Sequence, residues 1–152
     1  MAPLTAAMLT VSAAILAIAP LWHVYWAAGG RRGLAMAVPE RPGTGTPQFV
    51  PRRWLTLAVA FAIAAVAAVY FDVAYSGWPI PAAPVAGQIA AALLGLVFIA
   101  RAIGDFGYVG FFKRYGGTAF ARADTRCYSP LCLFLGISGL LPLAQTALNV
   151  IG

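Results

Sequence analysis

Residues 101–115 hold the residue types and spacings best suited to chemistry in this chain. Arg101 and Asp105 lie four residues apart at the end of a long apolar segment, and the sequence R-A-I-G-D-F-G-Y-V-G-F-F-K-R-Y then adds glycines, aromatic residues and two cations. Side chains four residues apart share one face of a helix, so Arg101 and Asp105 are predicted to form an ion pair. Ionisable groups beside so much apolar sequence are costly to desolvate, which makes this pair a candidate for structure or for function.

The pair has two interpretations. In the first, Arg101 and Asp105 neutralise each other and hold their loop in place, so that Asp105→Ala would leave Arg101 uncompensated. In the second, Arg101 binds an anionic or polar headgroup while His23 or Asp105 transfers a proton. The candidate ligand-binding residues of this second interpretation are His23, Tyr25, Arg101, Asp105, Tyr108, Lys113 and Arg126.

Neither a metal site nor a cofactor is expected from the sequence. The chain has one histidine, and Cys127 and Cys132 are further apart than the cysteines of a C-x-x-C motif. Phosphate-binding glycine loops and the sequences G-x-S-x-G and H-E-x-x-H are missing. Catalytic residues therefore cannot be assigned from motifs, and whether the protein is an enzyme stays open.

The composition places the chain among membrane proteins. Hydrophobic residues make up 62% of the sequence and charged residues only 9%, whereas soluble domains carry about 25% charged residues. The net charge of +6 could suggest nucleic acid as a partner. All ten cations fall on one side of the predicted membrane topology, however, so nucleic acid is not an expected partner and membrane lipids are.

Four apolar segments are long enough to cross a bilayer, which takes about 20 helical residues. We predict an all-α fold, a polytopic membrane protein built as a four-transmembrane-helix bundle. The spans lie at about residues 4–26, 54–72, 85–104 and 129–150 of a single integral membrane domain, 1–152. Ser129 and Pro130 are typical of the first turn of a helix, which places the start of the last span there.

Small residues repeat every four positions in the two middle spans. Ala60, Ala64 and Ala68 form such a stripe in the second span. Gly87, Ala91 and Gly95 form another in the third. Stripes of this kind let helix backbones approach closely inside a membrane, so each is predicted to face another helix.

The cations set the predicted orientation. Every Lys and Arg lies in or beside the first or the third loop. Positively charged loops stay on the cytoplasmic side of a membrane, so these are two cytoplasmic loops and both termini are expected on the outer side. The ends of the first, third and fourth spans would then meet at one cytoplasmic face.

Three ordered motifs resemble a known family. They are H-V-Y-W-A-A-G-G (23–30), R-A-I-G-D-F-G-Y-V-G-F-F-K-R (101–114) and D-T-R-C-Y-S-P-L-C (124–132). Together they are similar to a bacterial family of small four-span membrane proteins, the domain of unknown function 3995. The resemblance implies the four-span architecture, and it implies no activity. We expect the chain to be a multi-pass protein of a bacterial inner membrane.

Three functions are compatible with these features. The favoured hypothesis is a non-enzymatic accessory or lipid- or small-ligand-binding protein, with membrane lipids and a protein of a membrane complex as partners. The alternative is a small membrane-embedded enzyme that acts on a lipid-like or isoprenoid substrate. A transporter comes third, because ionisable groups are missing from the middle of the spans.

Overall fold

The computed structural model describes residues 1–41, 43–75 and 84–151. All regular structure in these ranges is helical, and four helices are long and apolar enough to cross a membrane. The all-α, four-helix fold class is thus confirmed. The helices are α1 (Pro3–Ala27), α2 (Leu34–Ala37), α3 (Arg53–Tyr75), α4 (Pro84–Ile103), α5 (Ala119–Ala123), a π-helix (Asp124–Tyr128) and α6 (Ser129–Ile151).

The last helix begins earlier than the Ser129–Pro130 signal predicts. Thr118 caps α5 by accepting a hydrogen bond from the Ala121 backbone N–H at 3.0 Å, and the helix then continues through the π-turn into α6. The backbone N–H of Ser129 donates to Asp124 O, five residues back. Proline has no N–H to complete an α-helical turn, and a π-turn just before Pro130 lets the helix continue around the missing donor.

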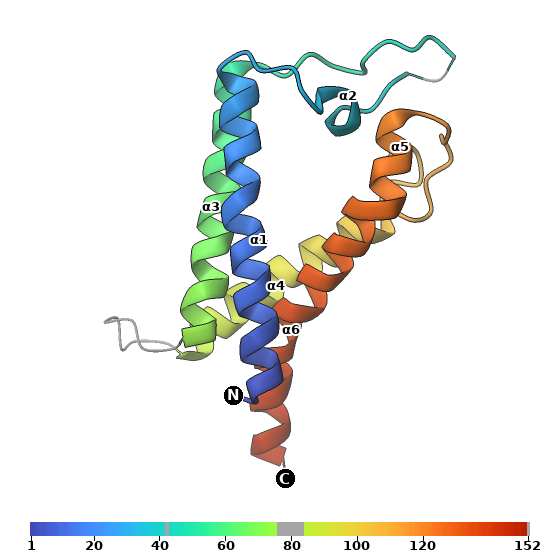
Figure 1. Cartoon of the computed structure of the whole chain (residues 1–152). Helices are drawn as coiled ribbons and strands as arrows, with labels where there is room; N and C mark the ends of the chain where they lie inside the picture. Colours follow the sequence, from blue (N-terminus) through green and yellow to red (C-terminus); the bar gives the residue numbers. More distant parts are fainter. Residues whose placement is uncertain (42, 76–83, 152) are drawn as a thin grey trace.

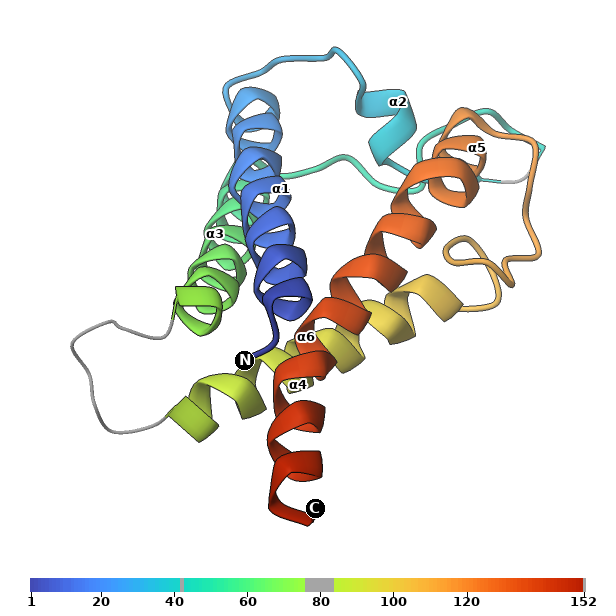
Figure 2. The same cartoon turned by 60° about the horizontal axis from the view of Figure 1, so that its bottom comes forward.

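The long helices form two pairs. Helix α1 packs along α3, and α4 packs along α6 (Figures 1 and 2). The pairs meet near the end at which both termini lie and separate toward the end that carries α2 and α5. At that far end, α2 of the first loop lies against α5 of the third loop. The two basic loops are therefore in contact although the helix pairs diverge.

The core lies where the two pairs meet. Tyr70 of α3 is fully buried and donates a hydrogen bond from its hydroxyl to Leu135 O of α6 at 3.0 Å. Leu9 and Leu16 of α1 pack in the same cluster. Buried positions of α1 recur at alternating intervals of four and three residues (Thr5, Leu9, Ser12, Leu16). This spacing is that of a coiled-coil seam, as expected for the long antiparallel contact with α3 (Figure 1).

One of the two predicted small-residue stripes packs as expected. Ala91 is fully buried, and an ideal Cβ placed on Gly95 would lie 2.7 Å from Gly136 O of α6. The stripe on α4 thus allows close approach of α4 and α6. The glycines of α6 on the other side of this contact, Gly136 and Gly139, were not predicted.

The stripe on α3 is predicted in the wrong register. Ala60 is buried, but Ala64 and Ala68 are exposed. The residues of α3 that are buried are Thr56, Ala60, Ala67, Tyr70, Val73 and Ala74. Near the end of α3 these residues face the other helix pair as well as α1, since Tyr70 bonds to Leu135 O of α6 and Val73 lies beside Gly87 of α4. Contact with a long neighbouring helix, and not residue size alone, therefore decides which face of α3 is buried.

Candidate functional site

The most highly connected polar group is the Asp124 carboxylate. It is fully buried at the start of the π-helix. Its Oδ1 accepts from Arg101 Nη2 at 2.6 Å. Its Oδ2 accepts from Lys113 Nζ at 2.9 Å, from the Gly110 backbone N–H at 2.8 Å and from Ser129 Oγ at 3.2 Å. Asp124 thereby joins the end of α4, the third loop and the start of α6.

The bonding of this carboxylate argues for a structural role. An ionised carboxylate offers about four lone-pair directions, and four donors already approach Asp124. The Lys113 side chain is 6% exposed and the Arg101 side chain 31%. Lys113 Nζ also donates to Gly110 O at 2.6 Å. Because the carboxylate is fully buried and held by these donors, it is out of reach of a substrate from which it could take a proton.

The predicted Arg101–Asp105 ion pair is wrong. Arg101 pairs with Asp124, and Oδ1 of Asp105 accepts from the backbone N–H groups of Gly107, Tyr108 and Val109 at 2.8, 2.7 and 3.0 Å. The physical reason is that α4 ends at Ile103 and Gly104 adopts a left-handed conformation with φ of 100°. The chain turns before Asp105, so the helical spacing of four no longer applies.

Asp105 therefore orders the loop, and its effect is expected to depend on pH. Partial burial by itself would raise the pKa of Asp105, but the backbone N–H groups of Val109, Gly107 and Tyr108 hold the pKa below its ordinary value of 3.8. Because its pKa is lowered, the ionised carboxylate stabilises the fold at pH values above the ordinary pKa. This stabilisation is lost as the pH falls through the lower pKa of the folded state.

Asp105→Ala is accordingly expected to destabilise the protein by about 1 kcal/mol at neutral pH, because an exposed carboxylate contributes little more than its hydrogen bonds. Thermal unfolding of both proteins in detergent, at neutral pH and at about pH 2, measures the effect. The gap between the two melting temperatures should narrow in acid. A gap that is equal at both pH values would contradict the role of the ionised carboxylate.

His23 and Tyr25 lie near the end of α1, away from this cluster. His23 Nδ1 lies 3.0 Å from Ala19 O, and since a carbonyl can only accept, Nδ1 carries a proton and donates this bond, whereas Nε2 makes no hydrogen bond with the described residues. The Tyr25 ring covers Gly30, where a Cβ would lie 2.3 Å from Tyr25 Cζ. The described contacts do not join either residue to Arg101 or Asp105.

His23 lines a cavity of about 570 Å³ between α1, α3 and the first loop. The cavity is enclosed mainly by apolar groups, with Arg52 and His23 as its ionisable members. Trp26 contributes its ring, and its Nε1 donates to Arg32 O at 2.9 Å. The remaining lining residues are Leu34, Ala37, Val38, Phe49, Val50, Pro51, Leu55, Thr56 and Val59.

The other predicted candidates lie elsewhere. Tyr108 lines a smaller cavity of about 210 Å³ with Glu40 and Arg114, where α2 and α5 bring the two loops together. Arg126 is exposed on the π-helix. Hydrogen bonds thus connect the predicted residues in two places: Arg101 and Lys113 both bond to Asp124, and Asp105 accepts from the backbone N–H of Tyr108. Asp124 itself was not among the predicted candidates.

In the part of the chain that the structure describes, no three His, Cys, Asp or Glu side chains come close enough to hold a metal ion. Cys127 and Cys132 are free thiols.

Comparison with known proteins places the chain in a family without adding an activity. Searches of curated proteins and of solved structures found no match. A family model described as a protein of unknown function, DUF3995, matches residues 15–139. This range contains α3, α4 and the Asp124 cluster, as well as the second half of α1 and the first half of α6. Because the match covers most of the sequence, the chain belongs to the DUF3995 family.

Proposed function

We propose that this protein binds a lipid-like amphiphile without chemically changing it, in the cavity between α1, α3 and the first loop. The basic loops lie on the cytoplasmic side of a bacterial inner membrane, and both termini lie on the outer side. The amphiphile places its apolar part against the cavity wall and its polar or anionic head near Arg52 and His23. A protein partner in a membrane complex would receive or present the ligand.

The observation that carries this proposal is the chemistry of the cavity wall. A volume of about 570 Å³ falls within the range of about 300–1,000 Å³ typical of small-molecule sites. Apolar side chains such as Leu55 and Val59 suit an alkyl or isoprenoid chain, and a guanidinium suits a carboxylate or phosphate. Trp26 is of the type that favours the headgroup level of a bilayer.

The orientation rests on the charge pattern. The cations of the chain lie in or beside the loops that carry α2 and α5, where anionic headgroups would attract them. The cavity would then open at the cytoplasmic leaflet. This topology can be tested with single cysteines placed at Gly116 and at Asn149, in a protein that lacks Cys127 and Cys132. A membrane-impermeant maleimide added to intact spheroplasts should label only the cysteine at position 149.

Binding is favoured over catalysis because the cavity holds few reactive groups. His23 and Arg52 are its only ionisable lining residues among those described, and Nδ1 of His23 is already used by Ala19 O. A catalytic histidine is usually oriented by a third group, often a carboxylate. No Asp or Glu is among the described residues that line this cavity, and the Asp124 carboxylate belongs to the structural cluster. The alternative, an enzyme acting on a lipid-like or isoprenoid substrate, would depend on the free Nε2 of His23.

The proposal predicts that Arg52→Gln weakens binding of a fluorescent fatty acid with a free carboxylate by about tenfold, the effect of losing about 1.4 kcal/mol. Fluorescence titration of the purified protein in a neutral detergent measures the Kd. The corresponding fatty alcohol should bind both proteins equally, since it has no charge for Arg52 to contact.

Arg53→Gln is the matched control. It removes the same charge one residue further along, at a position that does not line the cavity. Equal loss of affinity in both variants would assign the effect to net charge and contradict a site at Arg52. Conversion of the bound lipid by the wild-type protein, lost in His23→Gln, would replace the binding proposal with the enzymatic one.

A further inference from the structure

The segment between α4 and α5 exposes apolar rings and buries a charge. In this aromatic loop (residues 104–115), the side chains of Phe106, Phe111 and Phe112 are exposed, and Phe106 and Phe112 are 64% exposed each. The neighbouring Lys113 side chain is only 6% exposed. A loop that meets water usually has its charges outside and its large apolar groups covered. The surface of this loop therefore suits an apolar medium.

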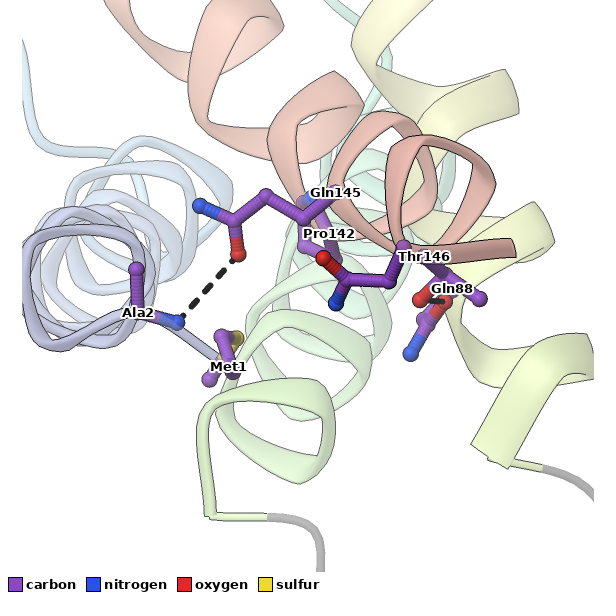
Figure 3. A pocket seen from close by; sticks show the side chains of 7 residues that line it. Met1, Ala2, Gln88, Pro142, Gln145 and Thr146 are labelled. Carbon is purple, nitrogen blue, oxygen red and sulfur yellow. Dashed lines mark hydrogen bonds between the residues drawn. The ribbon is translucent and has the colours of Figure 1, made fainter. Parts of the chain in front are cut away.

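The other end of the same helix pair has the ordinary arrangement. A pocket of about 420 Å³ there is lined by Met1 and by polar side chains of α4 and α6 (Figure 3). Gln145 reaches toward Ala2, and Thr146 Oγ1 donates to Gln88 Oε1 at 2.8 Å. Polar groups thus meet the solvent at that end. The exposed phenylalanines are consequently a property of the aromatic loop and not of both ends of the pair.

Phe106 is held at the surface by a strained backbone. Its φ is 58°, in the left-handed region that a bulky L-residue rarely adopts. Asp105 Oδ1 fixes this turn by accepting from the backbone N–H groups of residues 107–109. The centroid of the Phe106 ring lies 6.5 Å from that of Phe112, so the two rings form one patch. Strain that holds a ring at the surface gains little within the fold, which points to a contact outside the chain.

The backbone of the aromatic loop is bonded within the chain. Every backbone N–H of residues 107–112 donates to an acceptor of the protein itself. The N–H groups of Arg114 and Tyr115 both donate to Gly107 O, at 3.0 and 2.9 Å. Irregular backbone can lie at membrane depth only where the protein satisfies its polar groups. These N–H groups meet that condition.

The aromatic loop folds back beside the last turn of α4. The Phe111 backbone N–H donates to Ala102 O at 2.8 Å, and that of Phe112 donates to Ile103 O at 3.4 Å. Both phenylalanines therefore lie level with the end of a helix that is long and apolar enough to cross a membrane. Ile103 is itself exposed, so the apolar surface of α4 continues onto the loop.

Two exposed charges limit how deep the aromatic loop can lie. Asp105 and Arg114 are both exposed. Charged groups are costly in hydrocarbon, whereas the headgroup region accommodates them, and anionic headgroups attract a guanidinium. Apolar side chains next to such charges can reach the boundary between headgroups and acyl chains. The loop thus suits the interface of a bilayer.

We propose that the aromatic loop is an anchor in the leaflet next to the basic loops. The rings of Phe106, Phe111 and Phe112 lie among the upper acyl chains, and the charged side chains of the loop remain among the headgroups. Lipid is the occupant because the patch continues the apolar surface of a span. Through Lys113 and Asp124, the anchor also holds the start of α6 at the interface. It does not depend on the amphiphile cavity, so either can fail without the other.

The test measures how often a nitroxide on the loop collides with oxygen, which dissolves in acyl chains, and with a nickel chelate, which stays in water. The label is attached to Phe112→Cys in the full chain, with Cys127 and Cys132 replaced by serine. The protein is reconstituted in vesicles of phosphatidylcholine and phosphatidylglycerol and measured by electron paramagnetic resonance. Phe106→Cys is labelled as a second protein, so that the result does not depend on one substitution. Gly116→Cys is the matched control, because a Cβ there has no neighbour within 4 Å.

The labels at 106 and 112 should collide more often with oxygen than with nickel, and the label at 116 should do the reverse. The ratio of the two collision rates is thereby inverted within a short stretch of chain. Nickel collisions that outnumber oxygen collisions at both 106 and 112 would overturn the proposal.

A second measurement uses the wild-type protein and needs no substitution. The full chain with ¹⁵N-labelled phenylalanine is placed in nanodiscs of the same lipids. A lipid with a nitroxide near the top of its acyl chain should broaden the amide signals of Phe106 and Phe112 more than a soluble gadolinium chelate does. The opposite order would contradict the anchor.

A protein that covers the patch is the competing occupant. It can be detected with the label at 112 in polymer nanodiscs cut from the native membrane, which keep native lipids and partners. An oxygen-accessible label there supports lipid contact. A label shielded from both oxygen and nickel would show that a protein covers the patch, and the assignment to lipid would be wrong.

Discussion

The Asp124→Asn variant is expected to lose about 3–5 kcal/mol of stability, the cost of removing one partner from a buried ion pair. Asparagine keeps the shape of the side chain but has no charge to balance Arg101 and Lys113. Lys113 is the more affected cation because it is 6% exposed and cannot turn to water without unfolding its loop. Thermal unfolding in detergent, followed by circular dichroism, measures the loss as a lowered Tm.

A double variant separates charge from packing in this result. Adding Lys113→Met to Asp124→Asn removes one of the two uncompensated cations and should recover part of the lost stability. Arg122→Ala is the control, because Arg122 is exposed and its side chain donates, among the described residues, only to Gly117 O, at 2.7 Å. If the Asp124→Asn and Arg122→Ala proteins had the same Tm, the role assigned to the cluster would be falsified.

The long helices could be predicted from sequence because a bilayer imposes a local rule. Every backbone polar group in the hydrocarbon core must be bonded within its own helix, so length and hydropathy are sufficient to find the spans. The contact made by Ala91 and Gly95 could be predicted for a similar reason, since small residues at helical spacing permit close approach. Ala64 and Ala68 show the limit of this rule, because many alanines of a span face lipid.

The Asp124 cluster could not be predicted from spacing. Its donors come from the end of α4, the third loop and α6, so the contacts depend on the path of the loop. One signal was available. Gly104 directly precedes Asp105, and a glycine after an apolar helix is typical of a helix end. A helix that ends at this glycine cannot pair Arg101 with Asp105, which leaves Asp124 as the other carboxylate of the same loop region.

The predicted meeting of the span ends was right for α4 and α6, which the Asp124 cluster joins, and wrong for the end of α1, for a reason that depends on tertiary packing. A compact bundle would bring His23 close to Arg101. The two helix pairs instead separate toward this end, where α2 lies against α5. Crossing angles follow from how the core residues interdigitate, which hydropathy does not encode. His23 and the ion cluster consequently belong to different parts of the molecule.

Gly139→Ala is expected to destabilise the protein by about 2 kcal/mol, within the range for overpacking a close contact. A Cβ at this position would lie 2.4 Å from the Tyr70 hydroxyl and 2.5 Å from Ala91 O. The carbonyl belongs to the backbone of α4 and cannot move alone. The hydroxyl is held by its hydrogen bond to Leu135 O, so relief of the clash would break that bond or part α4 from α6. Thermal unfolding in detergent again gives the measurement.

Gly87→Ala is the matched control for this effect. Gly87 lies in α4, and a Cβ there would meet Val73 Cγ2 at 3.4 Å, an ordinary contact. The substitution should leave the Tm unchanged or raise it, because alanine favours a helix over glycine by about 1 kcal/mol. Both variants replace glycine with alanine inside a long helix, so propensity changes equally in the two. If Gly139→Ala were as stable as Gly87→Ala, α4 and α6 would have room between them, and the glycines of α6 would not set their approach.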